Sequence, residues 1–278
     1  AHCIVDYFSR INTVKNHTAT HMLQAALVQI LGTGIKQAGS SVCSESFRFD
    51  FSHQQALTDK QIKAVEDLVN QKIQEDITTK IFYTTLEEAK SAGAAAFFGE
   101  KYNPEKVRVV QIPGFSAELC GGVHVPSTGI IGCFKITSET ALSTGVRRIT
   151  GVTGHEAIKL FQQSFITVKK LSEDFKTKFE ETYDAVNKLQ ERYLEAQSQI
   201  KQMRKQLMKS QITEWQNKIT IVGKVPFVYL EIEDIPNQEM KSICTDFEKH
   251  KPGVYIILNK TGNSENFALI AYQSKKSE

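Results

Sequence analysis

The sequence predicts an α+β domain with a mixed sheet at residues 1–154. A long coiled-coil-type helix follows at residues 155–215, and a small βαββ domain at residues 216–278. Three observations predict this order. Helical and alternating apolar patterns follow one another in the first segment, the stretch from His155 to Val222 contains neither Gly nor Pro, and alternation returns after it.

The first segment contains two helical patterns and several strand patterns. "HTATHMLQAALVQIL" predicts a helix at residues 17–31 that Gly32 ends, and residues 57–73 predict a second helix with Thr58 or Asp59 as its N-cap. "SFRFDFS" places its three phenylalanines on one face of a half-buried strand. Further strands are expected at "KVRVVQI", "IIGCFKIT" and "VRRITGV".

The middle segment carries apolar residues at steps of three and four from Phe165 to Leu207, interrupted by the polar Ser172 and Thr182. This heptad period predicts one helix of about 45 residues, roughly 65 Å long. Its apolar stripe needs a partner, which is either a second copy of the chain or a later part of this one. The alternative is a helix that lies along a globular domain.

The last segment is expected to be a domain of about 60 residues, near the lower limit for a domain that folds alone. "ITIV" and "PFVYLEI" resemble strands, and "QEMKSICTDFEKH" has the apolar spacing of a helix. "GVYIILN" and "NFALIAY" flank "KTGNSE" as the two strands of a hairpin.

Composition excludes few function classes. The formal net charge of +3 is too small to indicate nucleic-acid binding by itself. Five scattered cysteines favour a reducing compartment without disulfides, and no apolar run reaches the ~18 residues of a membrane-spanning helix. We therefore expect a cytoplasmic protein that does not span a membrane. Because the chain begins with Ala1, we also expect it to be a fragment of a longer protein.

Two short motifs offer metal ligands. His17 and His21 in "HTATH" are four residues apart and so share one face of a helix, and Cys120 and His124 flank two glycines in "ELCGGVHV". Three imidazoles and a thiolate are ligands that Zn²⁺ prefers, so we expect one zinc ion per chain. The alternative is a solvent-facing histidine pair and a buried structural cysteine.

Two enzyme classes fit these motifs poorly. A zinc peptidase of the HExxH type places Glu directly after its first His, whereas this chain has Thr18 there. A nucleophilic pair of Cys120 and His124 is possible, but the sequence shows no residue that would orient the histidine.

The motifs together resemble a known family. "NHTATHMLQAAL", "SFRFDFSH", "FFGEKY", "ELCGGVHV", "TGIIGCFKI" and "TGVRRITGVTG" occur in this order. They are similar to the editing domain of alanyl-tRNA synthetases, over roughly residues 4–154. The helix and the small domain look like the carboxy-terminal region of that synthetase, with weaker motifs. Val123 departs from the family, which usually has Thr at this position.

The resemblance implies hydrolysis of the ester that joins serine or glycine to alanine tRNA, within an enzyme that ligates alanine to tRNA with ATP. It implies zinc ligation by His17, His21, Cys120 and His124. Cys120 is also a catalytic candidate, with Thr20 and Gln37 as candidates for recognising serine. Contacts to tRNA are expected from Arg147, Arg148 and Lys101.

Four protein ligands complete a tetrahedral zinc site, which is the structural pattern, whereas a catalytic zinc keeps one position open. The alternative function is therefore a tRNA-binding and dimerisation module with a purely structural zinc. A coiled-coil interaction protein with a vestigial domain is a third reading of the same features.

Overall fold

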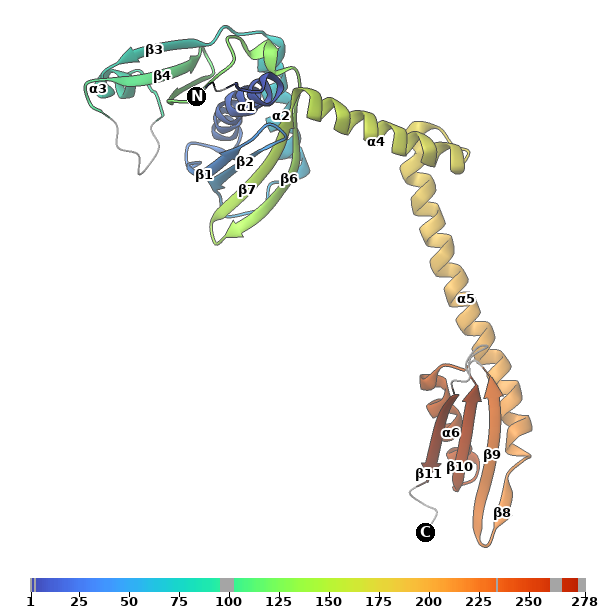
Figure 1. Ribbon diagram of the computed structural model, residues 1–278. Coiled ribbons are helices and arrows are strands. Elements are labelled where there is room, and N and C mark those ends of the chain that lie inside the picture. The colour runs from blue at the N-terminus through green and yellow to red at the C-terminus, as the bar shows by residue number, and fades with distance from the viewer. Residues whose placement is uncertain (1, 3, 96–102, 234, 261–266, 275–278) are drawn as a thin grey trace. The chain divides into compact units, whose positions relative to one another are not determined.

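The computed structural model describes residues 2, 4–95, 103–233, 235–260 and 267–274. The chain divides into two compact units, Ala1–Asp174 and Phe175–Glu278 (Figure 1). This division falls inside the segment that was expected to form one long helix. Within the described residues, no helix is both long and apolar enough to cross a membrane.

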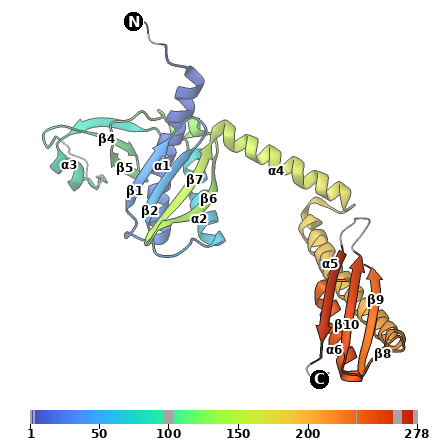
Figure 2. The same cartoon turned by 60° about the horizontal axis from the view of Figure 1, so that its bottom comes forward.

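The first unit is built on a four-stranded sheet whose strand order is β1-β2-β7-β6. Phe47, Phe49 and Phe51 of β2 are almost fully buried in the main core, as their alternation predicts. Helices α1 and α2 cover this face of the sheet (Figure 2). The elements are α1 Tyr7–Leu31, β1 Gln37–Val42, β2 Phe47–Ser52, α2 Asp59–Gln74, β6 Phe134–Ser143 and β7 Val146–Thr153.

Local sequence explains where the two helices begin. The carboxylate of Asp6 accepts a hydrogen bond from the Ser9 backbone N–H, so α1 starts ten residues before the expected His17. Helix α2 begins after Thr58, one of the two expected N-caps. Thr58 and Gln61 cap each other's backbone N–H groups in a capping box.

A second, three-stranded sheet has the order β3-β4-β5 and packs against the short helix α3 through a small core of its own. Its elements are β3 Lys80–Thr84, α3 Leu86–Ser91, β4 Val107–Ile112 and β5 Ser116–Leu119. A 3₁₀ turn, η1 Thr128–Ile131, lies between β5 and β6.

The expected mixed sheet is wrong for this unit, because the paired strands of both sheets are antiparallel. Strand β2 pairs with β7, about 100 residues later in the chain. Periodicity reports which residues are buried, and it contains no information on the direction of so distant a partner.

The expected single long helix is also wrong, because two helices occupy the segment. Helix α4 spans Gly154–Asp174, a 3₁₀ turn η2 spans Phe179–Glu181, and α5 spans Thr182–Gln216. Lys176 has a φ of 51°, a left-handed conformation that ends a helix. The hydroxyls of Ser172 and Thr182 flank the break and donate to nearby backbone carbonyls.

The second unit contains α5 and a four-stranded sheet of order β11-β10-β9-β8, with α6 packed against it. Strand β10 is parallel to β9 and antiparallel to β11, so this smaller sheet is the mixed one. The strand expected at "ITIV" is present as the short β8, so the unit is ββαββ, and the expected βαββ class omitted this strand. The elements are β8 Thr220–Val222, β9 Val225–Glu233, α6 Asn237–His250, β10 Val254–Lys260 and β11 Phe267–Gln273.

Candidate metal centre

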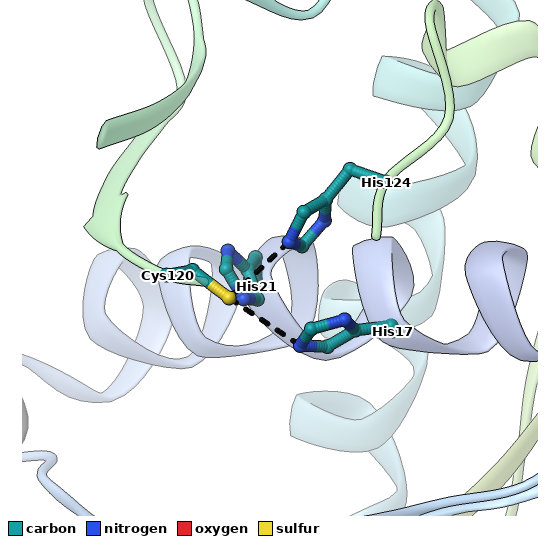
Figure 3. A group of neighbouring side chains, drawn as sticks. All are labelled: His17, His21, Cys120 and His124. Atoms are coloured by element: carbon teal, nitrogen blue, oxygen red, sulfur yellow. Dashed lines mark hydrogen bonds between the residues drawn. The ribbon is translucent and has the colours of Figure 1, made fainter. Parts of the chain in front are cut away.

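The two predicted ligand pairs meet in the first unit. His17 and His21 lie one turn apart on α1, and Cys120 and His124 lie on the loop that follows β5 (Figure 3). One ligand atom from each of the four residues lies within 4.8 Å of all the others. The expected convergence of the two motifs is therefore present.

The distances from Cys120 Sγ to two of the histidines suit a small tetrahedral ion. Cys120 Sγ lies 3.6 Å from His17 Nε2 and 3.3 Å from His124 Nε2. A tetrahedral Zn²⁺ with bonds of about 2.0–2.3 Å requires ligand atoms about 3.3–3.8 Å apart. One thiolate with three imidazoles is also a donor set that zinc prefers, so the residues fit Zn²⁺.

Gly122 allows the loop to approach α1 closely. A Cβ atom at this position would lie 2.1 Å from His17 Cε1, a distance that real Cβ contacts do not reach. The neighbouring Gly121 has open space where a Cβ would be. The requirement for glycine at 122 is thus steric and comes from the His17 ring on helix α1.

Hydrogen bonds select the ring nitrogens that face the centre. Thr18 Oγ1 donates to the Val14 carbonyl, so it accepts from its two other partners, His124 Nδ1 and the Val125 N–H. His17 Nδ1 lies 3.2 Å from the Val123 carbonyl, which can only accept. Both Nδ1 atoms therefore carry hydrogen, and both Nε2 atoms are left with a lone pair towards Cys120.

Glu118 lies behind the third histidine. Its Oε2 atom is 3.1 Å from His21 Nδ1, although the pair does not form an aligned hydrogen bond. Burial raises the pKa of the Glu118 carboxyl to about 8. A carboxyl group behind a histidine is a common way to orient a metal-binding imidazole.

The histidines are held in the neutral form that binds metals. Burial lowers the pKa of all three, most clearly for His21 and for His124, whose pKa falls to about 3. Repulsion from the neighbouring imidazoles also lowers the pKa of His21 and His124. For His17 the hydrogen bond to the Val123 carbonyl opposes the effect of burial on the pKa, and the Arg108 guanidinium lowers the pKa of His17 and His124 further.

Arg108 of β4 fixes the backbone of the ligand loop. Its NH1 group donates to the carbonyls of Cys120 and Gly122, at 2.7 Å each. The Cys120 N–H in turn donates to the Arg108 carbonyl at 3.1 Å. The Arg108 guanidinium therefore connects the turn between Cys120 and His124 to strand β4 of the three-stranded sheet.

A cavity of about 230 Å³ opens beside the cluster. Thr20 and Gln37 both line it, together with His17, His21 and Cys120. The Thr20 hydroxyl donates to the His17 carbonyl at 2.7 Å, and the Gln37 amide donates to Ser40 Oγ at 3.3 Å. Gln37 begins strand β1. Both candidates for serine recognition therefore lie beside the candidate metal ligands, in one cavity.

Both arginines among the candidate tRNA contacts pair with carboxylates. Arg148 makes two hydrogen bonds to the buried Asp50 carboxylate, at 2.7 and 2.9 Å, and Arg147 pairs in the same two-pronged way with Glu139. A phosphate would have to compete with these carboxylates, and the tRNA contact of both arginines stays a prediction. Lys101 and the whole of "FFGEKY" lie outside the described residues.

Three supporting residues were not predicted from the sequence, namely Thr18, Arg108 and Glu118. Two of them have a sequence feature that could have identified them. Thr18 is a polar residue inside the HTATH motif, and Glu118 lies two positions before Cys120, on a strand of alternating faces. Arg108 interrupts the apolar run of β4, but its partners depend on a pairing that the sequence does not reveal.

Comparisons with known proteins identify relatives of this chain. The family model described as the Threonyl and Alanyl tRNA synthetase second additional domain matches residues 107–150, which include Cys120 and His124. Alanine–tRNA ligase of Alkaliphilus oremlandii is 38% identical over 273 residues, which are 98% of this chain and 31% of that protein. Alanine–tRNA ligase of Thermotoga maritima is 45% identical over 210 residues, 76% of this chain and 23% of that protein.

The chain spans about a third of the length of the curated relatives that it matches most fully. The similarity covers both compact units in the longest of these alignments. Over almost its whole length, the chain is therefore similar to one segment of alanine–tRNA ligases, which confirms the family resemblance that its motifs carry.

Proposed function

We propose that this chain is the editing part of an alanine–tRNA ligase and acts in the cytoplasm. It would hydrolyse the ester between alanine tRNA and a wrong amino acid, serine or glycine. The observation that carries the proposal is the cavity in which Thr20 and Gln37 meet His17, His21 and Cys120. A polar cavity next to a metal-ligand cluster suits a small ester with a hydroxyl group.

The chemistry of alanine selection creates the need for such a site. A pocket made for alanine cannot exclude the smaller glycine, and an apolar pocket rejects an added hydroxyl by only about 100-fold. A second site that forms hydrogen bonds with the serine hydroxyl supplies the missing discrimination. Thr20 can accept from that hydroxyl, because its own hydrogen is already donated to the His17 carbonyl.

In this proposal His17, His21, Cys120 and His124 hold Zn²⁺, which when bound polarises an ester carbonyl or a water molecule. Thr20 and the Gln37 amide orient the amino acid in the cavity. A water molecule adds its oxygen to the carbonyl carbon, and the bond from that carbon to the ribose oxygen breaks. The ribose oxygen takes up the proton that the water loses, so no further reactant is needed.

The alternative function is a tRNA-binding and dimerisation module with a structural zinc. Two observations favour it. The four ligands are enough to close a tetrahedral site, and α5 exposes a row of apolar side chains. Deacylation of charged tRNA distinguishes the two functions, because only the first includes turnover.

The decisive experiment compares Cys120→Ala with Cys43→Ala. Cys43 lies in the same unit but is exposed and belongs to no ligand cluster in the described residues. Wild type and Cys43→Ala should contain one zinc ion per chain and deacylate serine-charged alanine tRNA at least about 100-fold faster than alanine-charged tRNA. Cys120→Ala should lose metal and most of this deacylation.

If Cys120→Ala kept both its metal and full deacylation, the proposal would be abandoned. A wild-type chain that binds zinc and tRNA without hydrolysing the ester would establish the alternative module.

A further inference from the structure

The three-stranded sheet presents a partly exposed surface next to the metal loop. Ile81, Tyr83, Lys106 and Arg108 form this surface, which we call the β3–β4 face. Tyr83 pairs in register with Arg108, so the two side chains lie on the same side of the sheet. Ile81 is two residues from Tyr83 on the same strand and shares that side. Lys106 lies just before β4, and its Nζ reaches the Tyr83 ring.

The aromatic and cationic groups of this face are accessible. The Tyr83 side chain is 61% exposed, and Lys106 Nζ lies 5.0 Å from the centre of its ring. On this side of the three described strands, the one carboxyl group belongs to Glu118, and it is buried against His21. On this side of the strands the accessible charge is therefore positive, and the exposed Glu105 lies beside Lys106 in the turn before β4.

The face is continuous with the metal centre. Tyr83, Arg108 and Cys120 form a row across adjacent strands, because Tyr83 pairs with Arg108 and the Cys120 N–H donates to the Arg108 carbonyl. With strands about 4.8 Å apart, the backbone at Tyr83 is about 10 Å from the backbone at Cys120. A nucleotide attached to an ester in the cavity can reach this far.

We infer that the β3–β4 face binds the single-stranded 3′ end of a tRNA. A base stacks on the Tyr83 ring, and Lys106 pairs with a neighbouring phosphate, while the ester occupies the cavity beside Cys120. An exposed aromatic ring with a cation beside it is the combination that binds single-stranded nucleic acid without reading its sequence. The inference rests on the proposed function, because that function supplies the tRNA.

A protein partner fits the face less well. Its accessible apolar surface consists of Ile81 and Tyr83, with cations on the same side. A hydrophobic protein contact is usually poor in charged residues at its centre. Phe82, the other exposed aromatic residue of β3, points to the opposite side of the sheet and does not extend the surface.

This geometry provides a matched pair of variants. Tyr83→Ala removes the ring on the β3–β4 face, and Phe82→Ala removes the adjacent ring on the other side of the same strand. Binding of uncharged alanine tRNA to the whole chain is measured by fluorescence anisotropy. Tyr83→Ala should raise Kd about 10-fold, whereas Tyr83→Phe and Phe82→Ala should stay within about twofold of wild type.

Lys106→Gln tests the phosphate contact. It should lower the slope of log Kd against log salt by about one. Zinc content is measured in every variant, since the metal loop should remain intact when Tyr83 or Lys106 is changed. An unchanged Kd in Tyr83→Ala, or equal losses in Tyr83→Ala and Phe82→Ala, would overturn the inference.

The binding assay contains no ester, so its result does not depend on hydrolysis. Weaker tRNA binding in Tyr83→Ala together with no deacylation in wild type would support this surface and refute the proposed function. Normal deacylation in wild type with unchanged tRNA binding in Tyr83→Ala would support the proposed function and refute binding at the β3–β4 face.

Discussion

Gly122 determines whether the metal loop can approach α1. We expect Gly122→Ala to weaken zinc binding by at least about 10-fold, because the new methyl group would overlap the His17 ring. Gly121→Ala is the matched control, since its methyl group would enter open space. Competition with a chromogenic chelator measures both affinities, and equal affinities would contradict the steric explanation.

The four ligands were predictable because each pair has a local spacing with a chemical meaning. His17 and His21 share a helix face, and Cys120 and His124 flank a turn of two glycines. The supporting residues were less accessible to this reasoning. Arg108 contacts the loop through an antiparallel pairing, and its two carbonyl partners are backbone groups that carry no residue signature.

At the scale of elements, the left-handed backbone of Lys176 marks the break between α4 and α5. We expect Lys176→Gly to raise the free energy of unfolding by about 1 kcal/mol, because glycine adopts the left-handed conformation without steric cost. Urea titration followed by circular dichroism measures this difference. A continuous helix would give the opposite sign, since glycine inside a helix costs about 1 kcal/mol.

Lys178→Gly is the control for that prediction. Lys178 has a φ of −74°, which lysine adopts readily, so glycine removes no steric cost at this position. It should leave stability unchanged or lower it slightly, through the greater freedom of the unfolded chain.

Sequence patterns predicted which residues of these elements are buried, but they did not predict where the long helical segment is interrupted. The phenylalanines of β2 and the apolar positions of α2 and α6 are buried as their periods predict. The heptad period did not reveal the break, because apolar residues can keep the same spacing in the sequence on both sides of a turn. Its two polar interruptions, Ser172 and Thr182, were the available signal, and they flank the break.

At the scale of the whole molecule, the apolar row on α5 predicts self-association. Leu189, Ile200 and Leu207 are each more than half exposed, although they occupy the predicted seam. Light scattering of the whole chain should give twice its mass of 31.2 kDa. The double variant Leu189→Lys, Ile200→Lys should give a monomer, because two charges per helix would enter the seam.

The matched control places the same charges away from the seam, in Glu191→Lys, Ser198→Lys. These positions lie on the opposite side of the heptad from Leu189 and Ile200. This variant should keep the mass of the wild type. A monomeric wild-type chain would exclude association through α5 at the concentration tested.

The four candidate ligands come from two different parts of the first unit. His17 and His21 belong to the helix that packs on the four-stranded sheet, and Cys120 and His124 belong to the loop that leaves the three-stranded sheet. A bound ion would therefore cross-link the two sheets of this unit, which also meet where Ile112 of β4 is buried in the main core. Metal loss would loosen the three-stranded sheet before the four-stranded one. The cavity between them would then lose its shape while most of the unit remained folded.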